Sequence, residues 1–250
     1  MKLGRIQSKH DPRTLQLTSY LAAFKLPDAP AQELLETTAA WPMLANDRFN
    51  CCTSAAAGHM VHHWRAANHH QIFLTDEDVI RAHARLTGDR LMEPVTMMAA
   101  LKFWRREGIG KHHIQAFVRA RAGDREELRC AIHLFGSAYL GLDLPRFACA
   151  GNPLSWPGIA WDIPAGVSPE DAAPQPEMGH CVTAVGYSEE GVLAVTWGCL
   201  KTMSWEFYRR YNVESYAVLS PDWVRRDHAC PSGFDCNSLL RDLVLLSAHT

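Results

Sequence analysis

The nine residues Gly179–Tyr187 read GHCVTAVGY, and a second apolar run that follows them ends in VTWG at Val195–Gly198. The polar residues SEEG at 188–191 separate the two runs. Two apolar runs joined by a short polar turn predict a hairpin of two half-buried strands. His180 then stands at the start of the first strand beside a flexible glycine, where its imidazole can face a cleft.

A second informative stretch lies upstream, where Asn46–Met60 read NDRFNCCTSAAAGHM. A polar loop leads into the cysteine pair Cys51 and Cys52, and a small-residue segment follows. Residues at spacings of three and four continue from there and predict one face of a helix: Ala55, Ala56, His59, Met60, His63, Trp64 and Ala67. The cysteine pair would therefore begin a helix, where free backbone N–H groups and the helix dipole stabilise a thiolate.

The histidine stretch resembles the histidine strand of papain-like cysteine peptidases, which reads Asn/Gly-His-Ala-Val, then Val-Gly-Tyr, then a strand ending in Ser-Trp-Gly. Members of this family bring a distant cysteine to the histidine in space. The resemblance covers residues 46–219 and is specific around 46–57 and 179–198. It implies an α+β, papain-like two-lobe fold, with a helical N-terminal lobe carrying the cysteine and a β-rich C-terminal lobe carrying His180.

The resemblance also implies roles for three residues. Cys52 would be the nucleophile and His180 its general base. The family carries a glutamine six residues before its cysteine, and Asn46 stands at that distance from Cys52. Its amide and the Cys52 backbone N–H would form the oxyanion hole, where each donor contributes about 3 kcal/mol. Cys51 remains the alternative nucleophile.

One position departs from the family pattern. The family's asparagine, which accepts a ring proton of the histidine, stands two residues before the tryptophan, and Val195 occupies that position here. We expect Val195 to face His180 without a hydrogen bond, and Thr196 to point to the opposite face because side chains alternate along a strand. The sequence thus predicts a Cys-His dyad without a local third residue.

Composition narrows the choice of function. A net charge of −2 with no Lys/Arg run gives no footprint for nucleic acid or a membrane surface. The N-terminal residues show no apolar signal region, and no stretch approaches eighteen apolar residues. We expect a soluble, cytoplasmic protein, with export by another route left open. The eight cysteines are expected to be mostly reduced thiols, although Cys230 and Cys236 could close a small loop.

The expected organisation is a single domain. It comprises an N-terminal arm at 1–45, a mainly helical lobe at 46–136, a mainly β lobe at 137–220 and a C-terminal helical segment at 221–250. Within these parts the sequence predicts short helices, strands and one long loop, as follows: helices at 31–38, after the Thr75 cap to Gly88, at 93–106, after the Asp124 cap to Gly136 and at 238–246; strands at 113–118, 138–144, 203–207 and 215–219; and a proline-rich loop at 145–176.

A zinc site is one alternative use of the histidines, because His59 and His63 lie one turn apart near the cysteine pair. No Cys-x-x-Cys pair accompanies them, so no metal or cofactor is expected. Within the long loop, Phe147, Trp156 and Trp161 either line an apolar subsite or anchor the loop.

The predicted function is a thiol hydrolase that cleaves a peptide or amide bond through an acyl-enzyme on Cys52, with a peptide or protein as its substrate. Two alternatives stay open. One is a papain-fold binding module with little or no activity, and the other is a cell-wall amidase or acyl-transferase. The sequence leaves the oligomeric state open.

Overall fold

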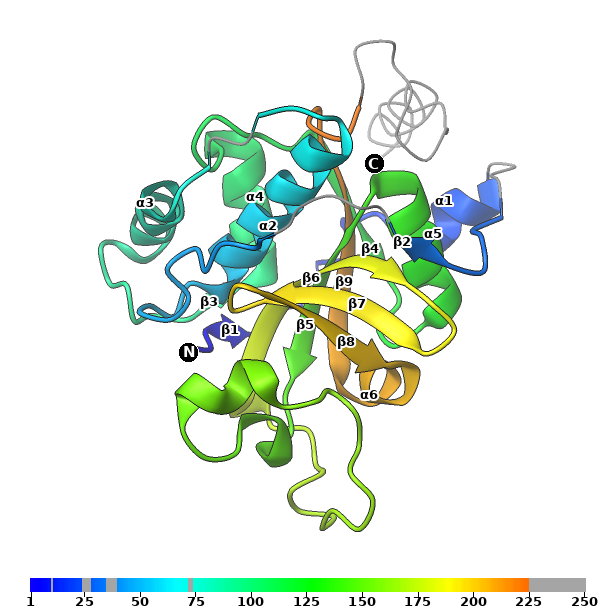
Figure 1. The fold of residues 1–250 in the computed structure, drawn as a ribbon. Helices are drawn as coiled ribbons and strands as arrows, with labels where there is room; N and C mark the ends of the chain where they lie inside the picture. The colour runs from blue at the N-terminus through cyan, green and yellow to red at the C-terminus, as the bar shows by residue number, and fades with distance from the viewer. Residues whose placement is uncertain (10, 24–27, 35–39, 72–73, 225–250) are drawn as a thin grey trace.

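The computed structural model describes residues 1–9, 11–23, 28–34, 40–71 and 74–224. Helices precede and flank a sheet whose strands come mostly from the second half of the chain (Figure 1). The strands are β1 Arg5–Ile6, β2 Glu33–Leu34, β3 Val95–Thr96, β4 Ala116–Ala120, β5 Ala138–Asp143, β6 Gly179–Tyr187, β7 Gly191–Thr196, β8 Cys199–Ser204 and β9 Asn212–Leu219. The helices are α1 Leu17–Ala23, α2 Cys52–Ala67, α3 Asp76–Thr87, α4 Met97–Glu107, α5 Arg125–Phe135 and α6 Trp205–Tyr211.

In the part of the chain that the structure describes, seven strands form one antiparallel sheet. Its main order is β4-β9-β5-β6-β7-β8, and the short β2 pairs with β6. The strand β6 is central and every one of its residues is buried. The expected strands at 138–144 and 179–187 are therefore present, and they are neighbours: Leu142 pairs with His180.

Two hydrophobic cores lie on the two sides of this sheet. One joins α2, α3 and α4 to one face through residues such as Tyr139 and Cys181. The other holds α5, α6 and the long loop against residues such as Leu140 and Val182. A helical group and a β-rich group thus pack on each other, as the α+β two-lobe prediction requires. The elements β4 and α5, expected in the helical lobe, instead belong with the sheet.

The helix boundaries follow the capping signals in the sequence. Thr75 forms a capping box with Asp78, and α3 ends at Gly88 in the left-handed region. Asp124 accepts bonds from two N–H groups in the first turn of α5, and Gly136 ends that helix in the left-handed region. Both stop signals are confirmed, because a residue without a side chain adopts this conformation at little cost.

Several local predictions were wrong. Residues 33–34 form a strand against β6 instead of part of a helix, and residues 205–211 form α6 instead of continuing a strand. Ser204 explains the second case, since its hydroxyl caps the helix at the Phe207 N–H. The long loop contains three short 3-10 turns, η1 Arg146–Cys149, η2 Pro153–Gly158 and η3 Pro176–Met178, and a β-bridge from Trp161 to Met203. The predicted helix at 238–246 and the Cys230–Cys236 loop lie outside the described residues.

The first six residues, the N-terminal strap Met1–Ile6, run between the helical group and the sheet (Figure 1). Its strand β1 pairs in parallel with β3, which precedes α4. On the other side, the Gly4 N–H donates to the carbonyl of Gly179 at 3.3 Å. The strap thus contacts both halves of the fold at their junction. None of the helices among the described residues has the length and apolar character to cross a bilayer.

Candidate active site

The histidine is positioned by the hairpin β6–β7–β8. The turn between β6 and β7 closes with a bond from the Ser188 N–H to the Gly191 carbonyl at 2.8 Å. Between β7 and β8 only Trp197 and Gly198 intervene, and both have positive φ, 46° and 70°. Two left-handed residues make the tight reversal that suits twisted strands. A tryptophan rarely adopts this conformation, and such strain concentrates at functional sites.

His180 is fully buried and held on two sides. Its Nε2 lies 2.7 Å from the Thr196 hydroxyl oxygen, and the Trp197 ring stacks on the imidazole at 4.5 Å between ring centres. The other ring nitrogen, Nδ1, is buried without a hydrogen-bond partner among the described residues. Burial, followed by the positive charge of Arg5, lowers the pKa of His180 to about 3, so the imidazole is neutral in this conformation.

The prediction that Val195 faces His180 was wrong. Thr196 faces the ring instead and provides the hydrogen-bond partner that we did not expect from β7. The register explains why: Val195 pairs with Thr183 and shares its face, so the next residue, Thr196, lies on the face of His180. Side chains do alternate between the two faces of β7, but the sequence does not reveal whether Val195 or Thr196 lies on the face of His180. Sequence reasoning thus missed Thr196 as the hydrogen-bond partner of His180.

Cys52 is the first residue of α2, as predicted, and its side chain is fully buried. Cys51 is the N-cap, and no side chain caps the helix there. Cys51 Sγ faces the Leu44 carbonyl at 3.7 Å. Burial raises the pKa of the Cys52 thiol to about 12, although the backbone of Cys181 and the charge of Arg5 oppose this effect. Cys52 therefore lies beside the backbone of the residue that follows His180.

The loop before the cysteine pair is tightly folded. Leu44 and Ala45 are buried with positive φ of 51° and 61°, which is unusual for residues with a Cβ. Asn46 is 2% exposed, and its amide donates to the Phe49 carbonyl at 3.3 Å. In this conformation the Asn46 side-chain amide is engaged in a hydrogen bond within its own loop.

The N-terminal strap contacts the loop before Cys52 and the tryptophan beside His180. The Lys2 N–H donates to the Asn46 carbonyl at 2.9 Å, and the Trp197 indole N–H donates to the Lys2 carbonyl at 3.0 Å. Next to them, Gly4 approaches Asn50 so closely that a Cβ on Gly4 would lie 2.0 Å from the Asn50 carbonyl oxygen. The strap thus binds the cysteine loop and the histidine hairpin together, and it fits only because residue 4 has no side chain.

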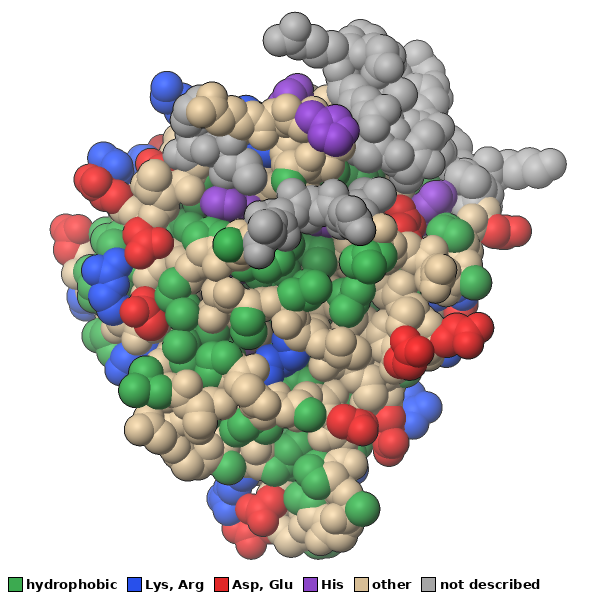
Figure 2. Space-filling model, viewed as in Figure 1, with side chains coloured by type: hydrophobic (Ala, Val, Ile, Leu, Met, Phe, Trp, Pro, Cys, Tyr) green, Lys and Arg blue, Asp and Glu red, His purple; other side chains and the backbone are tan. Residues whose placement is uncertain are grey.

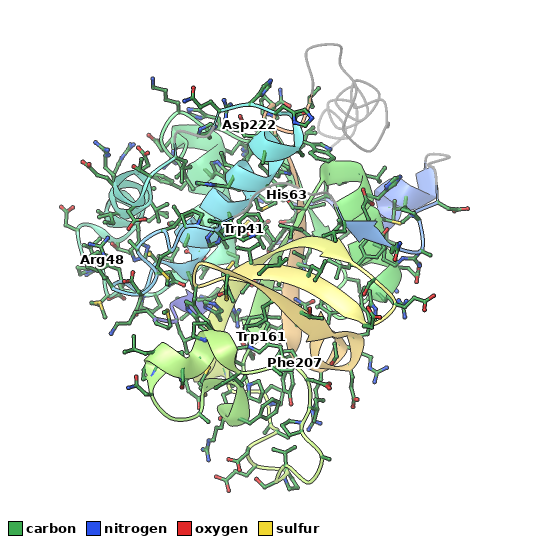
Figure 3. All side chains as sticks on the ribbon, in the orientation of Figure 1. Trp41, Arg48, His63, Trp161, Phe207 and Asp222 are labelled. Atoms are coloured by element: carbon green, nitrogen blue, oxygen red, sulfur yellow. The ribbon has the colours of Figure 1, made fainter. Side chains whose placement is uncertain are left out.

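The histidines of α2 have structural partners. His59 Nε2 lies 2.8 Å from the Pro42 carbonyl. The His63 ring stacks on Trp41 at 6.4 Å between ring centres, and the two residues are labelled near each other in Figure 3. Within the described ranges, no three His, Cys, Asp or Glu side chains are grouped so that they could hold a metal ion.

The aromatic residues of the long loop anchor it to the sheet lobe. Trp161 is buried and stacks on Phe207 at 5.6 Å between ring centres, and the two side chains lie together in Figure 3. Trp156 packs against Trp197 at 5.7 Å. The loop therefore supports the tryptophan that covers His180.

One face of the molecule carries an apolar area. On the face seen in Figure 2, many hydrophobic side chains gather toward the middle and most charged ones lie nearer the edges. A hollow of about 1040 Å³ lies elsewhere, lined by α3, α4 and residues including Arg65, Phe103 and Asp222. No residue of the cysteine loop or of β6 lines it, so we do not assign it to the candidate active site.

The helix α2, which begins at Cys52, packs on the sheet whose strand β6 carries His180. Comparison with solved structures shows that the chain has the fold of papain-like cysteine proteases. Xylellain, a cysteine protease from Xylella fastidiosa, is similar with a TM-score of 0.64 at 12% identity, over 87% of this chain and 95% of xylellain.

Two further structures share the fold. The cysteine protease and lectin-like domains of Cwp84 from Clostridium difficile match with a TM-score of 0.60 at 13% identity, over 88% of this chain and 56% of that one. The proform of Amb a 11, a ragweed pollen cysteine protease, matches with a TM-score of 0.51 at 10% identity, over 82% and 75%. No protein-family model matches the sequence, and no curated protein matches it significantly.

Proposed function

We propose that this protein is a thiol hydrolase that cleaves a peptide or amide bond in a peptide or protein substrate, with Cys52 as nucleophile and His180 as general base. The observation that carries the proposal is the state of the His180 ring. Thr196 engages Nε2 at 2.7 Å, while Nδ1 is buried without a partner in the described chain. If Nε2–H donates to the Thr196 hydroxyl, the Nδ1 lone pair is free to take a proton.

In the proposed reaction, His180 Nδ1 takes the proton of the Cys52 thiol, and Sγ attacks the carbonyl carbon of the substrate. The C–N bond breaks, the proton passes from His180 to the leaving amine, and a thioester remains on Cys52. Water, deprotonated by the same nitrogen, then attacks the thioester and releases the acid.

The developing oxyanion needs donors. The Cys52 backbone N–H lies at the uncapped start of α2, where the helix dipole also favours negative charge. The Asn46 amide is the second donor in this proposal, and it would turn from Phe49 when substrate binds. Thr196 acts as a positioning residue, because it holds the ring of the base without touching the substrate.

The closed conformation is a resting state in this proposal. The Cys52 thiol and the His180 imidazole are both buried and neutral, so displacement of the strap must precede the reaction. The same observation supports the second candidate function, a papain-fold binding module, if the strap never leaves.

The test compares the two adjacent cysteines as matched variants. Hydrolysis of a fluorogenic peptide library by the full chain should fall roughly 10³-fold or more in Cys52→Ser and in His180→Ala. Cys51→Ser is the control and should retain most of the activity. Hydrolysis that survives in Cys52→Ser but is lost in Cys51→Ser would move the nucleophile to Cys51. No hydrolysis or active-site labelling in any form, including one with the strap displaced, would favour the binding module.

A further inference from the structure

The side chain of Arg5 in the strap enters a buried acidic pocket in the sheet. It forms an ion pair with Asp143 on β5, and its Nη1 lies 3.7 Å from Glu214 Oε2 on β9. The Leu142 carbonyl accepts a further bond from Nη2 at 3.4 Å. The side chains of Arg5, Asp143 and Glu214 are 0%, 8% and 3% exposed. A guanidinium is thus bound inside the protein next to the candidate active site, since Asp143 pairs with Gly179, beside His180.

Two glycines shape this pocket for the strap. A Cβ on Gly141 of β5 would lie 2.9 Å from Arg5 Cδ, so the arginine stem crosses the strand where it has no side chain. A Cβ on Gly179 of β6 would lie 2.2 Å from the Arg5 carbonyl oxygen. Glycine is needed wherever another chain approaches a strand this closely. Both strands therefore make room for an arginine together with its backbone.

The charges in the pocket do not balance. Asp143 and Glu214 face a single guanidinium, and the Glu214 carboxylate also accepts a bond from the Tyr216 hydroxyl at 2.7 Å. Arg5 Nε and Nη1 are buried without a hydrogen-bond partner among the described residues. Arg5 therefore fills the pocket without satisfying all of its donors. The Ser8 N–H also donates to Glu214, at 3.4 Å. Without Arg5, two carboxylates would remain buried without a cation, which is costly, so the pocket favours a bound cation.

We propose that Asp143 and Glu214 form a subsite for a basic side chain of a peptide bound at the candidate active site, and that Arg5 occupies this subsite while the strap is in place. The assignment rests on the proposed function, since it names the substrate class as peptides that carry an arginine. A peptide must displace the strap and supply its own guanidinium to the two carboxylates. The planar fork of an arginine suits two acceptors better than the point charge of a lysine.

The test uses the full chain with the strap displaced by Gly4→Ala together with Arg5→Ala. The first change places a Cβ against the Asn50 backbone, and the second empties the pocket. The probes are two dye-labelled peptides: MKLGRI, the sequence of residues 1–6, and the same peptide with citrulline, the neutral isostere of arginine. We expect the variant to bind the arginine peptide roughly tenfold or more tightly than the citrulline peptide in fluorescence anisotropy.

The controls isolate the strap and the carboxylates. The unmodified chain and Gly158→Ala, where a Cβ meets nothing within 4 Å, should bind neither peptide measurably because Arg5 fills the pocket. Adding Glu214→Gln to the strap variant should reduce the preference for arginine to about threefold or less. Equal affinity for the two peptides, binding of neither, or equally tight binding by the unmodified chain would each overturn the proposal.

The measurement is independent of catalysis. If the arginine peptide binds selectively but no peptide is cleaved, the subsite stands and the hydrolase proposal fails. If the double variant does not fold, Arg5→Ala alone is tested with n-propylguanidinium and n-propylurea in thermal unfolding. A rise in Tm with the guanidinium only supports the subsite, and equal effects of the two compounds contradict it.

Discussion

The two halves of the candidate site are held in different ways. His180 lies in the central strand of the sheet, bonded to Thr196 and stacked on Trp197, and a loop anchored by aromatic contacts supports that tryptophan. Cys52 lies at an uncapped helix start, after a loop with strained backbone, and the strap donates a hydrogen bond to that loop at Asn46. Both halves lie in the core. The histidine half has side-chain partners of its own in the sheet, whereas the loop of the cysteine half is bonded to the strap, the segment that our proposal displaces.

The largest expected effect concerns the histidine half, at Val195. Val195 is fully buried on the face of Thr183, away from His180. Val195→Asn, which mimics the family's asparagine, would bury an amide without a partner and cost roughly 2–4 kcal/mol of unfolding free energy. Chemical denaturation measures this loss, and Val195→Ile serves as an apolar control. A stable Val195→Asn protein with raised activity would mean that residue 195, and not Thr196, serves the histidine.

This case shows where sequence reasoning succeeded and where it stopped. The GHCVTAVGY stretch predicted β6 and its hairpin, and the small residues after Cys52 predicted α2, because both patterns are local. The partner of His180 depends on strand register between β6 and β7, which includes a shift between Ala184 and Gly186. That shift leaves no reliable trace in one sequence.

The sequence did not predict where the strap Met1–Ile6 lies, and the reason is different. Residues 1–6 have few periodic features, and their placement depends on contacts with Asn46, Gly179 and Trp197, all distant in sequence. The glycines at positions 4, 141 and 179 were the available signal, since each is required only by the approach of another segment. Distant contacts of this kind do not follow from local pattern.

A second, smaller effect concerns Thr196 as a positioning residue. Thr196→Val keeps the shape of the side chain but removes the oxygen that engages His180 Nε2. We expect kcat on a cleaved peptide to fall roughly tenfold to hundredfold with little change in KM, because the ring loses its orientation. The pH–rate profile should also shift, and Thr196→Ser should restore most of the rate. An unchanged profile in Thr196→Val would assign the hydroxyl a structural role only.

The smallest expected effect concerns the strap, and it is the pH dependence of the stability that Arg5 contributes through Asp143. Burial raises the pKa of Asp143 above its ordinary value of 3.8, and the charge of Arg5 opposes that rise. A carboxyl with a raised folded-state pKa stabilises the fold below its unfolded pKa, and this contribution is lost as pH rises through the folded pKa.

Arg5→Ala removes the opposing charge, so the folded-state pKa of Asp143 should rise further. The stability lost through the substitution should therefore grow between about pH 4 and pH 7, by roughly 1 kcal/mol or more. Urea unfolding at several pH values measures it, with Asp143→Asn in the same background as the control. If Arg5→Ala lowers the unfolding free energy by the same amount at both ends of this range, the charge of Arg5 does not affect the pKa of Asp143.

The most direct test of the central claim, that His180 acts on Cys52 once the strap is displaced, is the rate of thiol alkylation. Iodoacetamide labelling of Gly4→Ala is followed by mass spectrometry, with Cys51 as the internal control. We predict that Cys52 is labelled roughly tenfold or more faster than Cys51 at about pH 6, and that adding His180→Ala removes this difference. In the unmodified chain both thiols are buried and should react slowly. Equal labelling of the two cysteines in Gly4→Ala, unaffected by His180→Ala, would contradict the account.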